Sequence, residues 1–204
     1  VHFQELFTTW STGACVVLVD DNFKKDSFVL CRFLSVEKIG RIFLPFVALN
    51  QLCQAYQSIN VTCSDTSPAL SLSIKEVITA GEQLQCTDAL IYLFEQTGAV
   101  LMNHYGPSES HVCTCLELIG DPKKWPVLPP IGKPISNSKI YLLDTNMNEV
   151  PIGVTGELYI GGICLAKQYW NKPEITAERF IPNPFYKASD NNDDARYLYK
   201  SGDL

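Results

Sequence analysis

Three short apolar runs, at residues 41–44, 76–79 and 99–102, are separated by segments whose apolar residues recur at helical spacing. Pro45 can begin the first of these helices, and Gly98 can end the second. Short β-branched runs are typical of buried strands, and strands that alternate with helices form a parallel sheet with right-handed crossovers. The sequence therefore predicts an α/β fold, in which ligands bind beyond the carboxyl ends of the strands.

Further elements are expected on both sides of this region. The spacing of apolar residues predicts a helix over residues 3–10, a strand over 14–19 and a helix over 26–38. After about residue 118, prolines and short apolar runs predict strands at residues 139–143, 156–160 and 197–200 and a helix at residues 173–180. We therefore predict an α/β portion at residues 1–117, followed by a β-rich, barrel-like lobe at residues 118–204.

Composition limits the partners of such a chain. The net charge of −6, without any cluster of lysine or arginine, argues against a nucleic-acid-binding surface. No signal peptide opens the chain, and no apolar run approaches the ~20 residues of a membrane span, so we expect a cytoplasmic protein that binds small molecules or proteins. The eight cysteines form no CxxC pair and the three histidines lack zinc-site spacing, which favours buried thiols in a reducing compartment and no structural metal. The phosphate-loop motif of P-loop NTPases and the glycine fingerprint of Rossmann dehydrogenases are both absent from the sequence.

The most distinctive motif, at residues 103–109, follows the strand expected at residues 99–102. Gly106 and Pro107 predict a tight turn, with Gly106 tolerating a positive φ. An amide can read a base edge, a ring can stack on a base, a hydroxyl can reach a phosphate and a carboxylate can hold a hard cation. The turn presents all four groups, at Asn103, Tyr105, Ser108 and Glu109.

Two other strand ends are expected to meet this turn. The strands at residues 41–44 and 76–79 end near Phe43 and at Ala80 and Gly81. Because the carboxyl ends of parallel strands meet at one edge of a sheet, this convergence favours a nucleotide site over a plain polar turn.

Four sequence blocks, in their order and spacing, resemble the adenylation domains of nonribosomal peptide synthetases. The blocks are residues 78–83, 103–109, 156–162 with 176–180, and 199–204, so the resemblance covers nearly the whole chain. It implies part of the large N-terminal subdomain of an adenylate-forming enzyme, in a superfamily that includes acyl-CoA ligases and luciferases. The implied reaction converts ATP and an amino acid to aminoacyl-AMP and pyrophosphate, before loading of a phosphopantetheine thiol on a downstream peptidyl carrier domain.

The resemblance also implies roles for individual residues. Tyr105 would stack on adenine, and Asn103 would hydrogen-bond to the edge of that base. Ser108 would donate to the α-phosphate and Glu109 would hold Mg²⁺, so these two are the expected catalytic residues. Asp203 would accept hydrogen bonds from both ribose hydroxyls. The implied nucleotide-binding set is Ala80, Gly81, Asn103, Tyr105, Ser108 and Asp203, with Glu109 as the metal ligand.

Substrate choice in this family is set by a group of pocket positions, which here resembles the pocket of proline-activating domains. The pocket contains no charged side chain and would surround a compact apolar ring, so we expect L-proline or a methylated proline as the substrate. Cys113 replaces the more usual valine, a difference that bears on a methylated ring. The implied pocket residues are Val1, Gln4, Phe43, Ile78, Ala80, His104, Gly106, Val112 and Cys113.

The resemblance places three essential groups outside this chain. A Ser/Thr/Gly-rich phosphate loop lies upstream, an aspartate that pairs with the substrate's amino group precedes Val1, and a catalytic lysine follows Leu204. We therefore expect a piece that is incomplete at both ends and inactive alone. Cys164 and Gln168 replace family glycines, and the backbone there is strained if those positions need a positive φ. Two alternatives stay open: an acyl-CoA or aryl-acid ligase, and a degenerate, non-catalytic interaction module.

Overall fold

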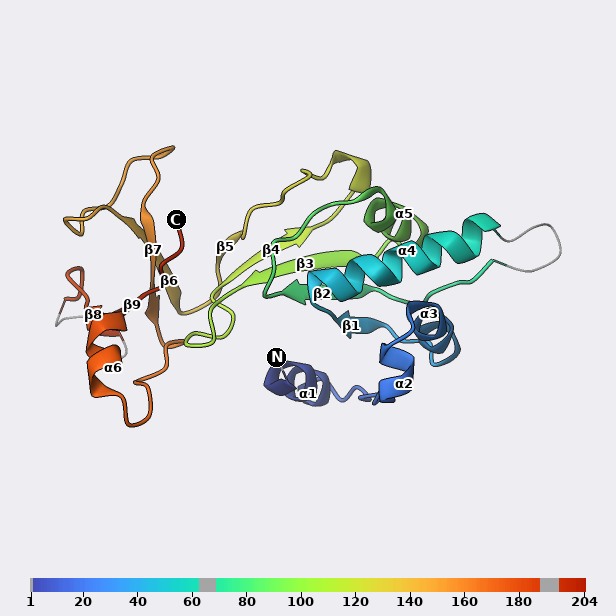
Figure 1. Ribbon diagram of the computed structural model, residues 1–204, viewed down its shortest axis with the longest axis horizontal. Coiled ribbons are helices and arrows are strands. Elements are labelled where there is room, and N and C mark those ends of the chain that lie inside the picture. The colour runs from blue at the N-terminus through green and yellow to red at the C-terminus, as the bar shows by residue number, and fades with distance from the viewer. Residues whose placement is uncertain (1, 63–68, 188–194) are drawn as a thin grey trace. The chain divides into compact units, whose positions relative to one another are not determined.

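The computed structural model describes residues 2–62, 69–187 and 195–204 of the chain (Figure 1). The helices are α1 (His2–Ser11), α2 (Asp21–Lys24), α3 (Ser27–Val36), α4 (Phe46–Thr62), α5 (Asp88–Thr97) and α6 (Pro173–Arg179), with a 3₁₀ turn, η1, at Pro122–Lys124. The strands are β1 (Arg41–Phe43), β2 (Glu76–Ala80), β3 (Val100–Tyr105), β4 (Thr114–Leu118), β5 (Lys133–Pro134), β6 (Ser138–Leu143), β7 (Glu157–Gly162), β8 (Phe180–Pro182) and β9 (Tyr197–Lys200).

The chain divides into two compact units. The first unit consists of the residues up to Asn103 together with Leu116–Pro130. The second unit consists of His104–Cys115 and Ile131–Leu204.

The first unit is built from the alternating strands and helices that the sequence predicts. β1 pairs in parallel with β2, and this register places Phe43 opposite Ile78. In the order of this sheet, β2 lies between β1 and β3. The expected α/β architecture with parallel strands is therefore confirmed for the first unit. The antiparallel pairing of β4 with β5 joins Thr114 to Pro134 and Cys115 to Lys133, and these four residues belong to the second unit.

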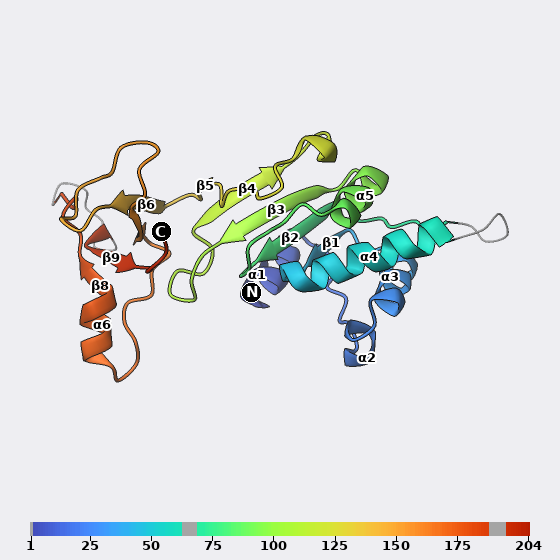
Figure 2. The same cartoon turned by 45° about the horizontal axis from the view of Figure 1, so that its top comes forward.

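The core of the first unit lies where α4 packs against β2, α3 and α5. Both views show α4 beside α3 and α5 (Figures 1 and 2). Burying one leucine side chain in a core of this kind contributes about 1.5–3 kcal/mol to folding. Local signals fix the ends of these helices: Asp26 accepts from the first backbone amides of α3, Thr87 does so for α5, and Gly98 ends α5 at a φ of 64°. The side chains buried completely in this core include Leu49, Leu52, Leu90 and Leu93.

The second unit contains an open antiparallel sheet. Its strand order is β6-β7-β9-β8, so β6 and β8 form opposite edges. β7 pairs on one side with β6 over its full length and on the other side with β9. The expected β-rich lobe is present, but its barrel-like character is wrong. Four strands of three to six residues leave two separate edges in the part of the chain that the structure describes.

The strand predicted over residues 14–19 is also wrong. These residues are described and have no regular secondary structure, and Leu18 is 84% exposed. An apolar run forms a stable strand only when a neighbouring strand takes up its backbone hydrogen bonds, and none does so among the described residues.

The cysteines agree only in part with the prediction of buried thiols. Cys31, Cys53, Cys86 and Cys113 are buried, whereas Cys15 is exposed. All of the described cysteines are free thiols, and Cys63 lies outside the described residues. Within the described ranges, every helix is too short or too polar to span a lipid bilayer.

Alkylation with iodoacetamide at pH 8 should separate these thiols. Burial raises the pKa of Cys31 to about 12 and the pKa of Cys86 to about 11, so very little of either is present as reactive thiolate. We expect Cys15 to be labelled first, and the two buried thiols only after denaturation, as measured by peptide mass spectrometry. Labelling of Cys86 at the rate of Cys15 would contradict this packing.

Candidate functional site

The turn after β3 returns the chain toward the strand that it has just left. The backbone amide of Cys113 donates to the carbonyl of Tyr105 with an N–O distance of 2.9 Å. Inside the turn, the amide of Ser110 donates to the carbonyl of Pro107 at 3.1 Å. β4 begins at Thr114, immediately after the closing bond. The predicted tight turn is therefore confirmed.

Gly106 is needed in this turn for a different reason from the one expected. Its φ is not positive, so the turn does not use the tolerance of glycine for a positive φ. A Cβ at this position would instead lie 1.6 Å from the backbone oxygen of His111 and 3.0 Å from the amide nitrogen of Cys113. The positive φ of the turn, 57°, belongs to His111. Glycine is required here because two backbone segments approach too closely to admit any side chain.

Tyr105 and Asp203 come together although they are far apart in the sequence. The hydroxyl of Tyr105 donates a hydrogen bond to a carboxylate oxygen of Asp203. Burial of the phenol, reinforced by the nearby carboxylate, raises the pKa of Tyr105 well above its usual range, so the hydroxyl stays protonated and can donate. Asp203 is held in turn by its own backbone, because its carbonyl accepts from the amide of Leu158 at 2.8 Å. The expected ribose-binding carboxylate therefore lies beside the expected adenine-stacking ring.

Glu109, like Asp203, accepts a hydrogen bond from a tyrosine. The hydroxyl of Tyr169 donates to Oε1 of Glu109, and the hydroxyl oxygen of Tyr199 lies 3.5 Å from that of Tyr169. Burial by itself raises the pKa of the Glu109 carboxyl, but the hydrogen bond from Tyr169, with smaller contributions that include the charge of Arg179, holds the pKa below its usual value. Glu109 is therefore an ionised, half-buried carboxylate.

Sequence reasoning did not identify Tyr169 and Tyr199 as part of the site. Tyr199 opens the last of the four blocks, and Tyr169 lies between two halves of the third. The available signal was chemical, because a half-buried tyrosine usually finds a partner for its hydroxyl. The sequence does not show which partner that is, since Glu109 lies 60 residues before Tyr169.

The other residues expected at the nucleotide lie on the two units separately. In the first unit, Ala80 and Gly81 end β2, and Gly81 has a φ of 88°. Asn103 is buried, and its amide nitrogen donates to the carbonyl of Pro130 at 3.0 Å. In the second unit, Ser108 is exposed at the turn, next to Glu109. Their contacts with a nucleotide stay a prediction.

The expected substrate-pocket residues also divide between the units. In the first unit, Phe43 lies opposite Ile78 in the sheet, Ala80 follows on the same side of β2, and Gln4 is half-buried on α1. In the second unit, Gly106 lies in the turn, Val112 is half-buried and His104 and Cys113 are buried. Val1 lies outside the described residues. The pocket as a whole stays a prediction.

The two residues that stand in place of family glycines do not strain the backbone. Neither Cys164 nor Gln168 has a positive φ. The left-handed positions of this region are Gly162, with a φ of 107°, and Asn171, with a φ of 54°. Backbone strain at these two positions therefore gives no support to a degenerate, non-catalytic module.

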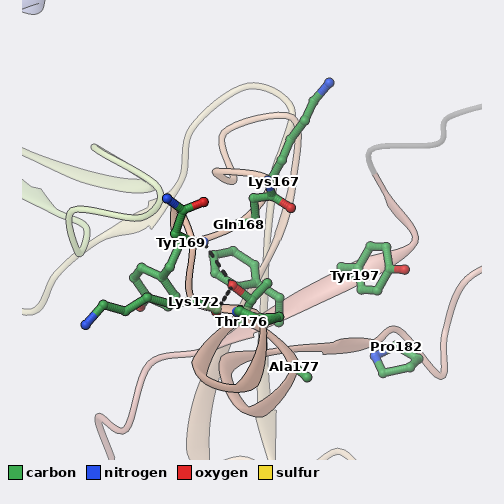
Figure 3. A pocket seen from close by; sticks show the side chains of 11 residues that line it. Lys167, Gln168, Tyr169, Lys172, Thr176, Ala177, Pro182 and Tyr197 are labelled. Atoms are coloured by element: carbon green, nitrogen blue, oxygen red, sulfur yellow. Dashed lines mark hydrogen bonds between the residues drawn. The ribbon is translucent and has the colours of Figure 1, made fainter.

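A hollow in the second unit lies beside α6 (Figure 3). Tyr169, Thr176 and Phe180 line it together with eight other residues. None of the residues predicted from the sequence to bind nucleotide or amino acid lines this hollow. Tyr169 is the residue that connects the hollow to the turn, through Glu109.

Comparisons with known proteins all find similarity to AMP-binding enzymes and peptide synthases. The family model described as "AMP-binding enzyme" matches residues 1–170. Tyrocidine synthase 2 from Brevibacillus parabrevis is 36% identical over 205 residues, and gramicidin S synthase 2 from Brevibacillus brevis is 36% identical over 206 residues. Both alignments cover the whole chain but only 5% and 4% of those proteins, so the chain spans a small part of their length.

A solved structure gives the same result for the fold. It is a four-domain nonribosomal peptide synthetase crystallised with AMP and glycine. The TM-score is 0.71 at 27% sequence identity, and the match covers 93% of this chain and 13% of that protein.

The close approach at Gly106 can be tested by adding a single methyl group. Gly106→Ala should lower the free energy of unfolding by about 1–3 kcal/mol, because the new Cβ overlaps a backbone carbonyl that must then move. Gly40→Ala is the matched control, since Gly40 has an ordinary φ and open space around its Cβ position. The control should stay within about 0.5 kcal/mol of the wild-type protein in urea unfolding. Equal stability of both variants would show that the turn is not built as described.

Proposed function

This chain belongs to the AMP-binding enzyme family and corresponds to part of a nonribosomal peptide synthetase adenylation domain, and we propose that it activates an amino acid with ATP. The observation that carries this proposal is the pairing of Tyr105 with Asp203. An aromatic ring and a carboxylate side by side suit the two halves of a nucleoside, because the ring stacks on the base and the carboxylate accepts from ribose hydroxyls.

In the proposed reaction, a carboxylate oxygen of the amino acid attacks the α-phosphorus of ATP. A new oxygen–phosphorus bond forms, the bond to the bridging oxygen of the β-phosphate breaks, and pyrophosphate leaves with that electron pair. Tyr105 and Asp203 hold the nucleoside so that its α-phosphate lies near the turn, where the hydroxyl of Ser108 can donate to a phosphate oxygen. Such positioning and charge stabilisation account for most of the catalysis of phosphoryl transfer.

A magnesium ion fits the chemistry of Glu109. Mg²⁺ is usually held by one or two carboxylates together with phosphate oxygens and water, so a lone ionised carboxylate beside the phosphates is sufficient. No group of three or more metal-ligating side chains gathers within the described ranges, which argues against an all-protein cation cage there. When bound, the ion supplies positive charge that offsets the charge of the phosphates.

The proposed amino acid is L-proline or a ring-methylated proline. The proposed pocket residues carry no carboxylate, ammonium or guanidinium group, so the pocket has nothing to pair with a charged side chain. The pairing of Phe43 with Ile78 supports an apolar wall on the first unit. The proposed partner for the product is a downstream peptidyl carrier domain, whose phosphopantetheine thiol accepts the aminoacyl group.

The proline assignment can be tested by amino-acid-dependent ATP–pyrophosphate exchange in the synthetase that contains this chain. Proline should give the highest exchange, with modest exchange for valine-sized substrates, since one methylene discriminates by only ~1–3 kcal/mol. Ala80→Leu should crowd the proposed pocket and depress proline exchange, whereas Lys123→Ala, at an exposed ion pair with Glu95, should not. If a charged or large aromatic substrate leads and proline is inert, the pocket assignment is wrong and the adenylation chemistry stands.

The stacking role of Tyr105 can be separated from its hydrogen bond to Asp203. Tyr105→Ala should raise the KM for ATP, because stacking contributes about 1–3 kcal/mol per base. Tyr105→Phe keeps the ring and removes only the hydroxyl, so its KM for ATP should stay much closer to the wild-type value. Equal KM values for wild type and Tyr105→Ala would show that adenine binds elsewhere.

A further inference from the structure

We propose that Tyr169 is a positioning residue for the reaction, which acts by holding the Glu109 carboxylate in the orientation that receives the cation. The inference rests on the proposed function, because it gives Tyr169 a purpose only if Glu109 faces nucleotide phosphates. Nothing in the sequence blocks assigns Tyr169 such a role. Its basis is a chain of contacts within the second unit.

The first link is the hydrogen bond itself. The phenol hydroxyl of Tyr169 donates to Oε1 of Glu109, and its oxygen lies 3.5 Å from the hydroxyl oxygen of Tyr199. A glutamate has three side-chain torsions, and the last of them has only broad, weak preferences, so partial burial alone does not fix the direction of the carboxylate. A hydroxyl aimed at one carboxylate oxygen restricts these rotations and keeps the group in one orientation, as outer-sphere partners do for metal-binding carboxylates.

The second link ties the backbone of Glu109 to the same loop. The amide of Ala166 donates to the carbonyl oxygen of Glu109 at 2.6 Å. The segment that carries Ala166 and Tyr169 therefore holds Glu109 at two points, once through the main chain and once through the side chain. Two attachments fix both where the residue lies and which way its carboxylate points.

The third link fixes Tyr169. Its backbone amide donates to Oγ1 of Thr176 at 3.0 Å, and the same hydroxyl donates to the carbonyl of Lys172 at 2.7 Å. Figure 3 draws both bonds, which join the loop to the first turn of α6. Thr176 uses its hydroxyl as acceptor and donor at once, so it ties the backbone of Tyr169 to a regular helix.

Aromatic packing fixes the direction of the phenol. The ring of Tyr169 meets the ring of Phe180 edge-on, with 5.7 Å between centroids. Phe180 is buried and packs in turn on Tyr199, at 5.2 Å. A ring held in this way has one rotational setting, and its hydroxyl therefore has a fixed position.

The test compares two tyrosine-to-phenylalanine changes in the synthetase that contains this chain. Tyr169→Phe removes one hydroxyl and keeps the ring. Tyr159→Phe is the matched control, because Tyr159 donates to Glu157 at 3.1 Å in a similar tyrosine–glutamate pair on β7, away from the turn. Tyr169→Phe should raise the Mg²⁺ concentration for half-maximal ATP–pyrophosphate exchange about tenfold, the lower end of the effect of losing an outer-sphere partner. The KM for the amino acid should stay unchanged, and Tyr159→Phe should alter neither value.

A binding measurement gives a readout that does not depend on turnover. Electron paramagnetic resonance of Mn²⁺ added to the enzyme with ATP should show about tenfold weaker binding for Tyr169→Phe than for Tyr159→Phe. Equal Mn²⁺ affinities in the two variants would overturn the proposal.

A double-mutant cycle distinguishes action through Glu109 from a general loss of structure. Because Tyr169 is proposed to act only through that carboxylate, Tyr169→Phe should cause no further loss of exchange in a Glu109→Ala background. Additive losses would overturn the proposal. If Glu109→Ala impairs exchange and Tyr169→Phe behaves as wild type, the proposal fails and the proposed function stands. If Glu109→Ala has no effect, both fail.

A second pair of variants applies if Tyr169→Phe does not fold. Thr176→Val removes the hydroxyl that anchors the backbone of Tyr169, and Thr176→Ser keeps it. The valine variant should need a higher Mg²⁺ concentration for half-maximal exchange, and the serine variant should keep the wild-type concentration. Identical Mg²⁺ dependence in the two variants would overturn the proposal.

Discussion

The candidate site depends on the close backbone approach at Gly106. The bond from the Cys113 amide to the Tyr105 carbonyl forms only because no Cβ stands between the turn and the backbone of His111. That bond sets the direction in which the chain leaves β3 after Tyr105 and the point at which it enters β4. Glu109 lies within the same closed turn, so the position of the carboxylate depends on the same glycine.

Both carboxylates of the candidate site are held by tyrosine hydroxyls. Tyr105 donates to Asp203, and Tyr169 donates to Glu109. Burial of these rings, reinforced by the carboxylates, raises the pKa of each phenol well above its usual range, so each stays a donor when its partner is ionised. A tyrosine suits this task because an apolar ring can be fixed by packing while the hydroxyl at its tip remains available.

The sequence predicted best those features whose cause is local. Gly98 ends α5, and the apolar runs became β1, β2 and β3 because each carries its own signal of composition and punctuation. Predictions failed where the outcome depends on a distant partner. Residues 14–19 have no neighbouring strand among the described residues, and the second sheet stays open because β6 and β8 do not meet there. The role of Gly106 was misjudged for the same reason, since the atom that excludes a side chain belongs to His111.

The turn and the proposed substrate pocket use different parts of Cys113. The bond that closes the turn uses the backbone amide of Cys113, which any residue except proline supplies. Its thiol lies 3.4 Å from the Tyr105 carbonyl, and a thiol is a weak donor that contributes little there. The side chain can therefore be exchanged for another small apolar one without loss of the closing bond. Variation at this position can reshape the proposed pocket while Tyr105 and Glu109 keep their places, because the pocket uses the side chain and the turn uses the main chain.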